Sequence, residues 1–461
     1  MKAKVNHQLF FISMISAMGG LLFGYDWVVI GGAKPFYEQF FQIANDPMLQ
    51  GWAMSSALIG CLFGALASGK LSDRFGRKPI LIIAAALFVC TSIGTGLSAN
   101  FTWFNIFRLI GGFAIGLASS LSPMYIAEIA PAKLRGRYVA INQLTVVLGI
   151  LAAQLVNWLI AEPVPANATA EMIQQSWNGQ MGWRLMFLVM TIPAGLFFSL
   201  GFLLPESPRW LAVSGQKDKA FKILTKLVGS ESAIEELQAI DASAQTEQKG
   251  SFKQLLHTSL RKVLIIGIGL AIFQQWCGIN VIFNYAQEIF MSAGYGVSDV
   301  LLNIVITGVT NVIFTIIAMY FVDKWGRKAL LLLGAFGLTL IYALMGSAYY
   351  FHLTGAFLLV VVVLAIACYA MTLAPVMWIV ISEIYPNRIR GIAMSVATFA
   401  LWTACFILTY TFPLLNKGMG AAGTFWLYGL ICLAGGIFVL IKVPETKGKT
   451  LEELESELVK K

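Results

Sequence analysis

The chain has 461 residues, of which 58% are hydrophobic and 12% charged, and its formal net charge is +9. This composition excludes an ordinary soluble domain. An excess of Lys and Arg beside apolar segments is typical of membrane proteins, so the charge requires no nucleic-acid partner.

Near-continuous apolar runs of about 20 residues, bounded by Lys, Arg, Pro or Gly, predict membrane-spanning helices. The runs do not alternate between polar and apolar residues, as the strands of a β-barrel would. Twelve runs are present, with approximate limits 9–33, 52–71, 79–98, 103–126, 138–161, 184–204, 262–290, 299–322, 329–350, 356–382, 391–414 and 423–442.

The loops after spans 2, 4, 6, 8 and 10 hold most of the Lys and Arg, and the opposite loops hold few. Because Lys and Arg favour the cytoplasmic side, both termini are expected to be cytoplasmic, in a cell membrane. The few basic residues assigned to the opposite loops are Lys34, Arg184 and Lys417.

One long polar segment, about 205–260, follows span 6. Ser207-Pro208 is typical of a helix start, and 217–227 and 232–244 have the spacing of short amphipathic helices. We interpret the segment as a connector and brace without chemistry. The tail has a capping box that starts at Thr450.

Metal-ligating residue types are sparse. The six cysteines lie in or beside apolar spans, and the three histidines are scattered. Neither set has metal-ligand spacing, and the sequence has no Walker A loop. We expect no metal, no cofactor and no enzymatic activity, and ATP-driven transport by this chain alone is disfavoured.

The chain repeats some of its most unusual segments about 255 residues apart. In an apolar chain such a repeat predicts two similar halves with the functional site between them. The repeated segments are Asp73-Arg74-Phe75-Gly76-Arg77-Lys78 with Asp323-Lys324-Trp325-Gly326-Arg327-Lys328, and Glu128 and Arg135 with Glu383 and Arg390.

The expected fold is an all-α membrane protein with twelve transmembrane helices in two pseudo-symmetric six-helix bundles and a cytoplasmic helical insert. The bundles are expected at 1–204 and 261–443, the cytoplasmic linker domain at 205–260 and the cytoplasmic tail at 444–461.

Asp26 lies within an apolar run, where a charge costs on the order of 2.5–3.5 kcal/mol and usually faces a cavity or a partner. Span 1 runs outward and span 4 inward. At about 1.5 Å per residue, Asp26 and Arg108 both lie some 8–9 Å inside the outer boundary, which makes an ion pair possible. Burial favours the neutral acid and Arg108 the carboxylate, so cavity opening could load and release a proton. The alternative is a fixed pair that never titrates.

The repeat fails at both members of this pair. Gly24-Tyr25-Asp26 aligns with a segment ending in Asn280, and Arg108 aligns with Val363. An acid in one half is therefore a neutral amide in the other. We expect proton coupling in the N-terminal half and substrate recognition mainly in the C-terminal half.

Span 7 carries three amides, Gln274, Gln275 and Asn280, which are costly in a membrane unless they are hydrogen-bonded. An unbroken helix would turn Asn280 about 140° away from Gln275. A break near Gly278 would let all three face one cavity. Amides both donate and accept hydrogen bonds, which suits a neutral polyhydroxyl ligand.

Further candidates are two amides and two tryptophans in apolar surroundings. A tryptophan offers a flat face to the C–H side of a sugar ring and an indole N–H. Each of these residues alone could equally be a helix–helix contact, and only their combination favours a site. They are Gln143, Asn311, Trp378 and Trp402.

The repeated charged motifs lie at predicted cytoplasmic ends. Together with Glu206 and Arg209 they could form an ion-pair network between the bundles that closes an inner gate. The alternative is that they serve only as a topology signal. The candidate gating residues are Asp73, Arg77, Glu128, Arg135, Glu206, Arg327, Glu383 and Arg390.

Over essentially its whole length the sequence resembles the sugar porter family of the major facilitator superfamily, in particular its bacterial proton–sugar symporters. The segments that carry the resemblance are Gly24-Tyr25-Asp26, Asp73-Arg74-Phe75-Gly76-Arg77-Lys78, Pro205-Glu206-Ser207-Pro208-Arg209-Trp210, Gln274-Gln275 with Gly278-Ile279-Asn280, Asp323 with Gly326-Arg327, and Pro444-Glu445-Thr446-Lys447-Gly448.

The resemblance implies that Asp26 is the proton-linked acid, that Arg108 is its partner, and that the amides and tryptophans above contact a monosaccharide. The paired tyrosines of the family are Asn284-Tyr285 here, which implies a different outer gate. Leu401 replaces an amide of the family, and Ile150 stands where the xylose symporter has Gln, which favours a hexose.

The sequence therefore predicts a proton-coupled monosaccharide importer that works by alternating access. Its expected partners are the sugar, the proton and the lipid bilayer, and it is expected to function as a monomer. The alternatives are a facilitator with a static Asp26–Arg108 pair, a non-transporting sugar sensor, which the short tail argues against, and drug efflux, which the span-7 amides disfavour.

Overall fold

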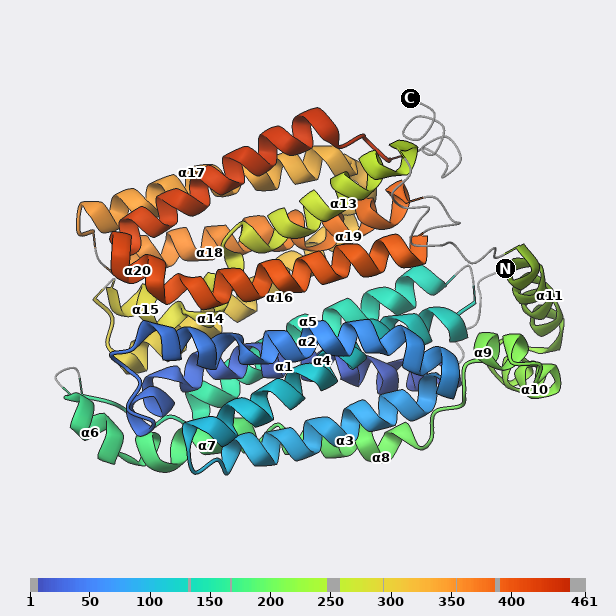
Figure 1. Ribbon diagram of the computed structural model, residues 1–461, viewed down its shortest axis with the longest axis horizontal. Helices are drawn as coiled ribbons and strands as arrows, with labels where there is room; N and C mark the ends of the chain where they lie inside the picture. Colours follow the sequence, from blue (N-terminus) through green and yellow to red (C-terminus); the bar gives the residue numbers. More distant parts are fainter. Residues whose placement is uncertain are drawn as a thin grey trace. The chain divides into compact units, whose positions relative to one another are not determined.

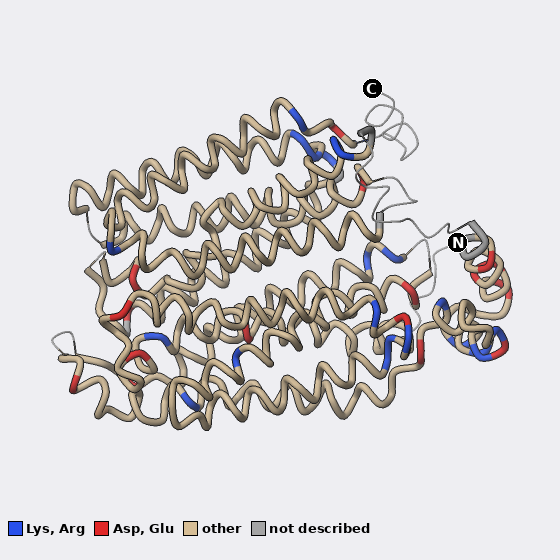
Figure 2. The backbone as a smooth tube through the Cα atoms, viewed as in Figure 1, with Lys and Arg blue, Asp and Glu red and all other residues tan. Residues whose placement is uncertain are grey.

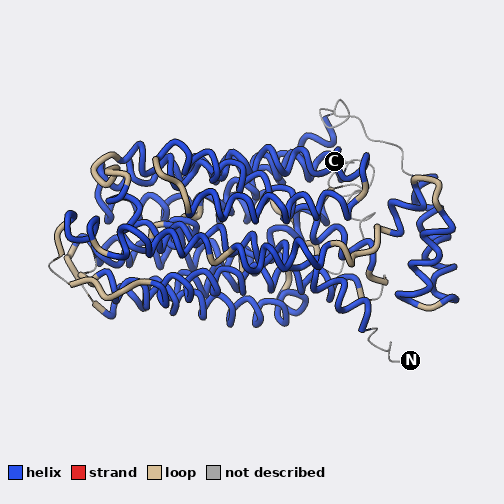
Figure 3. Tube along the Cα trace, turned by 90° about the horizontal axis from the view of Figure 1, so that it is seen from below, coloured by secondary structure: helices blue, strands red, loops and turns tan. Residues whose placement is uncertain are grey.

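The structure is a computed structural model that describes residues 7–131, 134–165, 168–246, 258–292, 294–353, 355–385 and 390–447. Every regular element among these residues is helical (Figures 1 and 3). The chain forms two compact units. Unit 1 comprises 1–27, 59–153 and 187–248, and unit 2 comprises 28–58, 154–186 and 249–461.

The helices up to the polar segment are α1 (His7–Phe40), α2 (Pro47–Phe75), α3 (Arg77–Gly96), α4 (Phe101–Ile129), α5 (Arg135–Ile160), α6 (Ala170–Gln175), η1 (Asn178–Gly182), α7 (Trp183–Leu188) and α8 (Thr191–Gly201). The polar segment contains α9 (Pro208–Val213), α10 (Lys217–Val228) and α11 (Ser230–Thr246). The remaining helices are α13 (Thr258–Trp276), α14 (Ile279–Asn284), α15 (Ala286–Ser292), α16 (Val297–Trp325), α17 (Arg327–Tyr350), α18 (Ala356–Met371), α19 (Leu373–Ile384) and α20 (Arg390–Lys442).

Within the described chain, eleven helical segments are long and apolar enough to cross a membrane. The last contains a backbone break at Gly420, where φ is 69° and ψ is 174°. Its two arms correspond to the spans predicted at 391–414 and 423–442, so the twelve-span, all-α layout is confirmed. Figure 2 shows most charged residues near the ends of the long helices, as expected for membrane spans.

Glycines allow the long helices of unit 1 to approach closely. A Cβ added to Gly60 on α2 would lie 1.9 Å from the Leu109 carbonyl oxygen on α4. One added to Gly24 on α1 would lie 1.9 Å from the Val146 oxygen on α5. Helices in membranes associate through such small residues. Because Gly24 is two residues before Asp26, this contact also fixes the position of Asp26 along α5.

The predicted helices of the polar segment are confirmed. The Ser207 side chain accepts a hydrogen bond from the Trp210 backbone N–H at 3.2 Å and so caps α9. A small core around Leu211, Ala212 and Ala220 holds the short helices together. The capping box at Thr450 lies outside the described residues.

The assignment of Lys34, Arg184 and Lys417 to loops is wrong, because all three lie in helices, with Lys417 in α20 before the break at Gly420. Helix α1 continues to Phe40, and Lys34 within it is 2% exposed. Arg184 belongs to α7, and its guanidinium carbon lies 4.5 Å from the centre of the Trp183 ring. Basic residues can remain in helices of an apolar chain where carboxylates or aromatic rings compensate them.

Candidate functional site

Asp26 and Arg108 form a buried ion pair between α1 and α4 in unit 1. The distance from Arg108 Nη1 to Asp26 Oδ1 is 2.7 Å, and the side chains are 3% and 9% exposed for Arg108 and Asp26. Asp26 Oδ2 is buried and has no hydrogen-bond partner among the described residues. One carboxylate oxygen is thus held by a cation, and the other can accept a proton without losing a hydrogen bond.

The three predicted amides of span 7 meet in unit 2. Gln275 Nε2 donates to Gln274 Oε1 at 3.0 Å, and Asn280 Nδ2 donates to Gln275 Oε1. All three residues are buried. We call Gln274, Gln275 and Asn280 the amide chain. No formal charge takes part in these hydrogen bonds, so the amide chain suits a neutral ligand rather than an ion.

A break in span 7 brings the amide chain together. Helix α13 ends at Trp276 and α14 begins at Ile279, with Gly278 between them at φ 84° and ψ −4°. This left-handed conformation is tolerated by glycine and strained for other residues. The turn allows Asn280 to reach back to Gln275, which an unbroken helix would not permit.

The other predicted recognition residues are distributed as follows. Asn311 on α16 and Trp402 on α20 are buried in unit 2, and Trp378 on α19 is half-buried there. Gln143 on α5 is exposed and belongs to unit 1. Their contact with a ligand stays a prediction.

The predicted outer gate residues are both buried in unit 2. Tyr285 donates a hydrogen bond from its hydroxyl to the Thr409 carbonyl oxygen at 2.7 Å. Its ring centre lies 4.4 Å from that of Phe412. Asn284 Oδ1 is buried and has no hydrogen-bond partner among the described residues.

Arg77 organises the charged motif of unit 1. It donates two hydrogen bonds to Glu128, at 3.0 and 2.9 Å, and a third to Asp73 at 3.2 Å. Glu206 accepts from the backbone N–H groups of Arg77 at 2.9 Å and of Ser207 at 2.7 Å. The Glu206 carboxylate therefore caps the N-terminus of α3, where the helix dipole favours a negative charge.

Unit 2 repeats this arrangement. Arg327 contacts Glu383 at 3.4 Å. Glu445 accepts from the backbone N–H groups of Arg327, Lys328 and Lys447 at 2.9, 3.1 and 3.0 Å. Partial burial raises the pKa of Glu445, but the backbone donors outweigh burial and hold the pKa below its ordinary value.

Each of these ion pairs joins residues of one unit, and the network between the bundles stays a prediction. Arg135 donates to the Ala127 carbonyl oxygen at 2.9 Å. The side chain of Arg390 lies outside the described residues.

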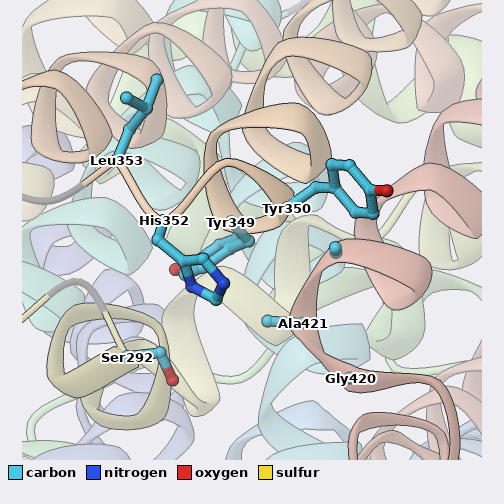
Figure 4. Close-up of a pocket in the computed structure, with 8 residues that line it drawn as sticks. Ser292, Tyr349, Tyr350, His352, Leu353, Gly420 and Ala421 are labelled. Atoms are coloured by element: carbon cyan, nitrogen blue, oxygen red, sulfur yellow. The ribbon is translucent and has the colours of Figure 1, made fainter.

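A cavity of about 400 Å³ lies elsewhere in unit 2 (Figure 4). Its lining contains none of the predicted site residues. The lining residues are Ser292, Tyr349, Tyr350, His352, Leu353, Gly420, Ala421 and Ala422. The amide chain, rather than this cavity, is therefore the candidate recognition site.

Three further contacts were not foreseen from the sequence. Cys405 Sγ lies 3.5 Å from Asn280 Nδ2, so a thiol adjoins the amide chain. Lys34 contacts both Glu38 and Glu288. Lys34 and Glu38 are four residues apart, which is one helical turn, and this spacing was the available signal for the Lys34–Glu38 contact.

Apolar helices of spanning length and a buried ion pair inside them define a polytopic α-helical membrane protein. A family model described as "Sugar (and other) transporter" matches residues 12–458. The chain belongs to this family, which confirms the resemblance. The relatives described next are transporters rather than enzymes.

The arabinose-proton symporter of Bacillus subtilis is 40% identical over 459 residues, which cover 99% of this chain and 97% of that protein. The D-xylose-proton symporter of Escherichia coli K12 is 39% identical over 480 residues, covering 97% and 95%. The inward open conformation of the xylose transporter from E. coli superimposes with a TM-score of 0.85 at 38% identity, covering 98% and 100% of the two chains.

Proposed function

We propose that the protein is a proton-coupled monosaccharide symporter that works by alternating access. The Asp26–Arg108 pair is the observation that carries the proposal. One Asp26 oxygen binds Arg108 at 2.7 Å, and the other has no donor among the described residues. Protonation of Asp26 would weaken this pair and so link proton binding to the packing of α1 on α4. Relatives named as arabinose-proton and D-xylose-proton symporters support the same function.

The test is Asp26→Asn, which keeps the shape of the side chain but cannot be protonated. Concentrative uptake and sugar-dependent alkalinisation of the outside medium should be lost, while sugar counterflow in proteoliposomes should remain. Uptake against a gradient by Asp26→Asn would contradict the proposal. A wild-type protein that moves sugar without alkalinisation would be a facilitator in which the pair is static.

The substrate proposed is a neutral monosaccharide, with a hexose favoured over a pentose. The amide chain supports a neutral polyhydroxyl ligand, and the apolar Ile150 supports the hexose. Relatives are named for arabinose, D-xylose and glucose transport. Counterflow with a panel of labelled hexoses and pentoses distinguishes these sugars. Pentoses that outcompete every hexose would overturn this preference.

We further propose that the protein lies in the cell membrane as a monomer, with both termini on the cytoplasmic side. The bias of Lys and Arg among the loops supports this orientation. Protease cleavage of terminal tags in right-side-out and inside-out vesicles tests it.

A further inference from the structure

Three charged side chains of unit 2 meet outside the amide chain. Lys34 and Glu38 lie one turn apart on α1, and Glu288 lies on α15. Lys34 Nζ is 2.8 Å from Glu38 Oε1 and also contacts Glu288 Oε1. We call these residues the outer triad. The side chains of Lys34 and Glu38 are 2% and 7% exposed, and burial of such charges is tolerated because they are paired.

The part of α1 that carries Lys34 packs closely in unit 2. A Cβ added to Gly31 would lie 3.0 Å from the Phe283 carbonyl oxygen and 3.1 Å from that of Asn284, both on α14. One added to Gly32 would lie 2.2 Å from the side-chain nitrogen of Asn157 on α5. These short distances mean that α1 packs directly against α14 and α5 at this level.

The two ion pairs of Lys34 differ in what would break them. Glu38 is on the same helix, so its pair survives any movement of α1 as a rigid body. Glu288 is on α15, so its pair breaks when α1 and α15 separate. The cost of breaking a buried pair is largest when a charge is left alone. Lys34 would keep Glu38, and the Glu288 side chain is already 25% exposed. The contact between α1 and α15 can therefore open without leaving a buried charge unpaired.

The outer triad is connected to the amide chain through a short stretch of backbone. Asn280 is on α14, which is joined to α15 only by Tyr285. Lys34 Nζ also lies 5.5 Å from the centre of the Tyr285 ring. A contact that holds α15 on α1 therefore limits the movement of α14 and of Asn280.

We propose that Lys34 is a positioning residue of the transport cycle. Its pair with Glu288 holds α14 and α15 against α1 and keeps the outer side of the amide chain closed. When α1 and α15 separate, water replaces Lys34 as the partner of the Glu288 carboxylate, and Lys34 remains paired with Glu38. The inference deepens the proposed function and rests on it for the direction of transport and for the side that is called outer.

The experiment compares hydrogen–deuterium exchange of the full chain in lipid nanodiscs for wild type, Lys34→Met, Glu288→Gln and the exchanged pair Lys34→Glu/Glu288→Lys. Lys34→Met should raise exchange in 28–40 and 279–292 on the order of tenfold. Glu288→Gln should raise it less, because Lys34 keeps Glu38. The exchanged pair restores one cation and two anions and should return both segments to wild-type exchange. Lys417→Met removes an exposed charge and should change nothing.

Unchanged exchange of both segments in Lys34→Met and in Glu288→Gln would overturn the proposal. Failure of the exchanged pair to restore exchange would also overturn it, because the effect would then come from lost packing. Exchange in α17 serves as an internal reference for global unfolding. Sugar counterflow is measured separately, on the same variants reconstituted into proteoliposomes. Absent counterflow in wild type would contradict the proposed function, while the exchange data would still report on the contact between α1 and α15.

Discussion

Glu206 and Glu445 hold equivalent positions in the two units. Glu206 accepts a hydrogen bond from the Arg77 backbone N–H at the start of α3, and Glu445 accepts one from that of Arg327 at the start of α17. The bond length is 2.9 Å in both cases. The positive φ of the preceding glycine, 93° at Gly76 and 89° at Gly326, turns the chain toward the carboxylate. The repeat seen in the sequence is therefore also a repeat of hydrogen bonds.

Glu445→Gln should destabilise the protein at neutral pH but not in acid. We expect a loss of roughly 0.5–1 kcal/mol at pH 7, since partial exposure screens the carboxylate. The folded state holds the pKa of Glu445 below its ordinary value of 4.5. This stability is therefore present above pH 4.5 and is lost as the pH falls through the lower folded-state pKa. Thermal unfolding over a pH series that runs from pH 7 to well below pH 4.5 measures it, with the exposed Glu235→Gln as control. A difference that does not change with pH would contradict the prediction.

Gly278→Ala and Gly229→Ala form a matched pair. Both glycines have positive φ, 84° and 87°, but an added Cβ meets the Tyr428 ring at 2.8 Å in the first and nothing in the second. Each should lose about 1 kcal/mol from backbone strain. Gly278→Ala should in addition weaken sugar binding, because the turn that joins Gln275 to Asn280 is distorted. Isothermal titration measures this, and equal binding by both variants would refute the role of the turn.

Gln275→Ala and Asn280→Ala should each weaken sugar binding by about tenfold, the loss of one or two hydrogen bonds. The double variant should lose less than the sum of the two free energies, because the side chains are bonded to each other. Asn303→Ala removes a buried amide elsewhere in unit 2 and serves as control. Strict additivity in a double-mutant cycle on counterflow affinity would argue against the amide chain.

Arg77→Lys should slow transport and destabilise the protein more than Arg327→Lys. Arg77 makes a two-point contact with Glu128, at 3.0 and 2.9 Å, that the single ammonium of Lys cannot reproduce. The described contact of Arg327 with Glu383 is longer, at 3.4 Å, so Lys at this position loses less of the pairing with the glutamate. The difference should be about 1–2 kcal/mol. Melting temperatures and initial uptake rates check it. A larger loss of stability or uptake rate in Arg327→Lys would show that the contacts with Glu128 and Glu383 do not determine the importance of the two motifs.

The contact between Asp26 and Arg108 could be predicted because helix rise is constant and both residues lie inside long apolar runs. Depth alone then places them at one level. The break at Gly278 was predictable for a similar reason, since three amides cannot share one face of an unbroken helix. The roles of these residues remain predictions, which Asp26→Asn and the amide variants test.

The outer triad could not be predicted, because a charge beside the end of an apolar run resembles a loop residue. Only the structure, in which α1 continues to Phe40 and Lys34 is 2% exposed, shows that this residue is buried. Its partner Glu288 is 254 residues away, and no local pattern connects them. The Cys405 contact with Asn280 could not be predicted for the same reason, because tertiary packing alone brings α14 to α20.

The Glu445 cap has a practical consequence for expression and purification. Besides Glu445, the Lys447 ammonium donates to the Lys324 carbonyl oxygen at 2.6 Å, so the segment after α20 is attached to the junction of α16 and α17. A shortened version that ends before Glu445, or an affinity tag fused there, would remove this attachment. Tags and protease sites should therefore be placed after Lys447.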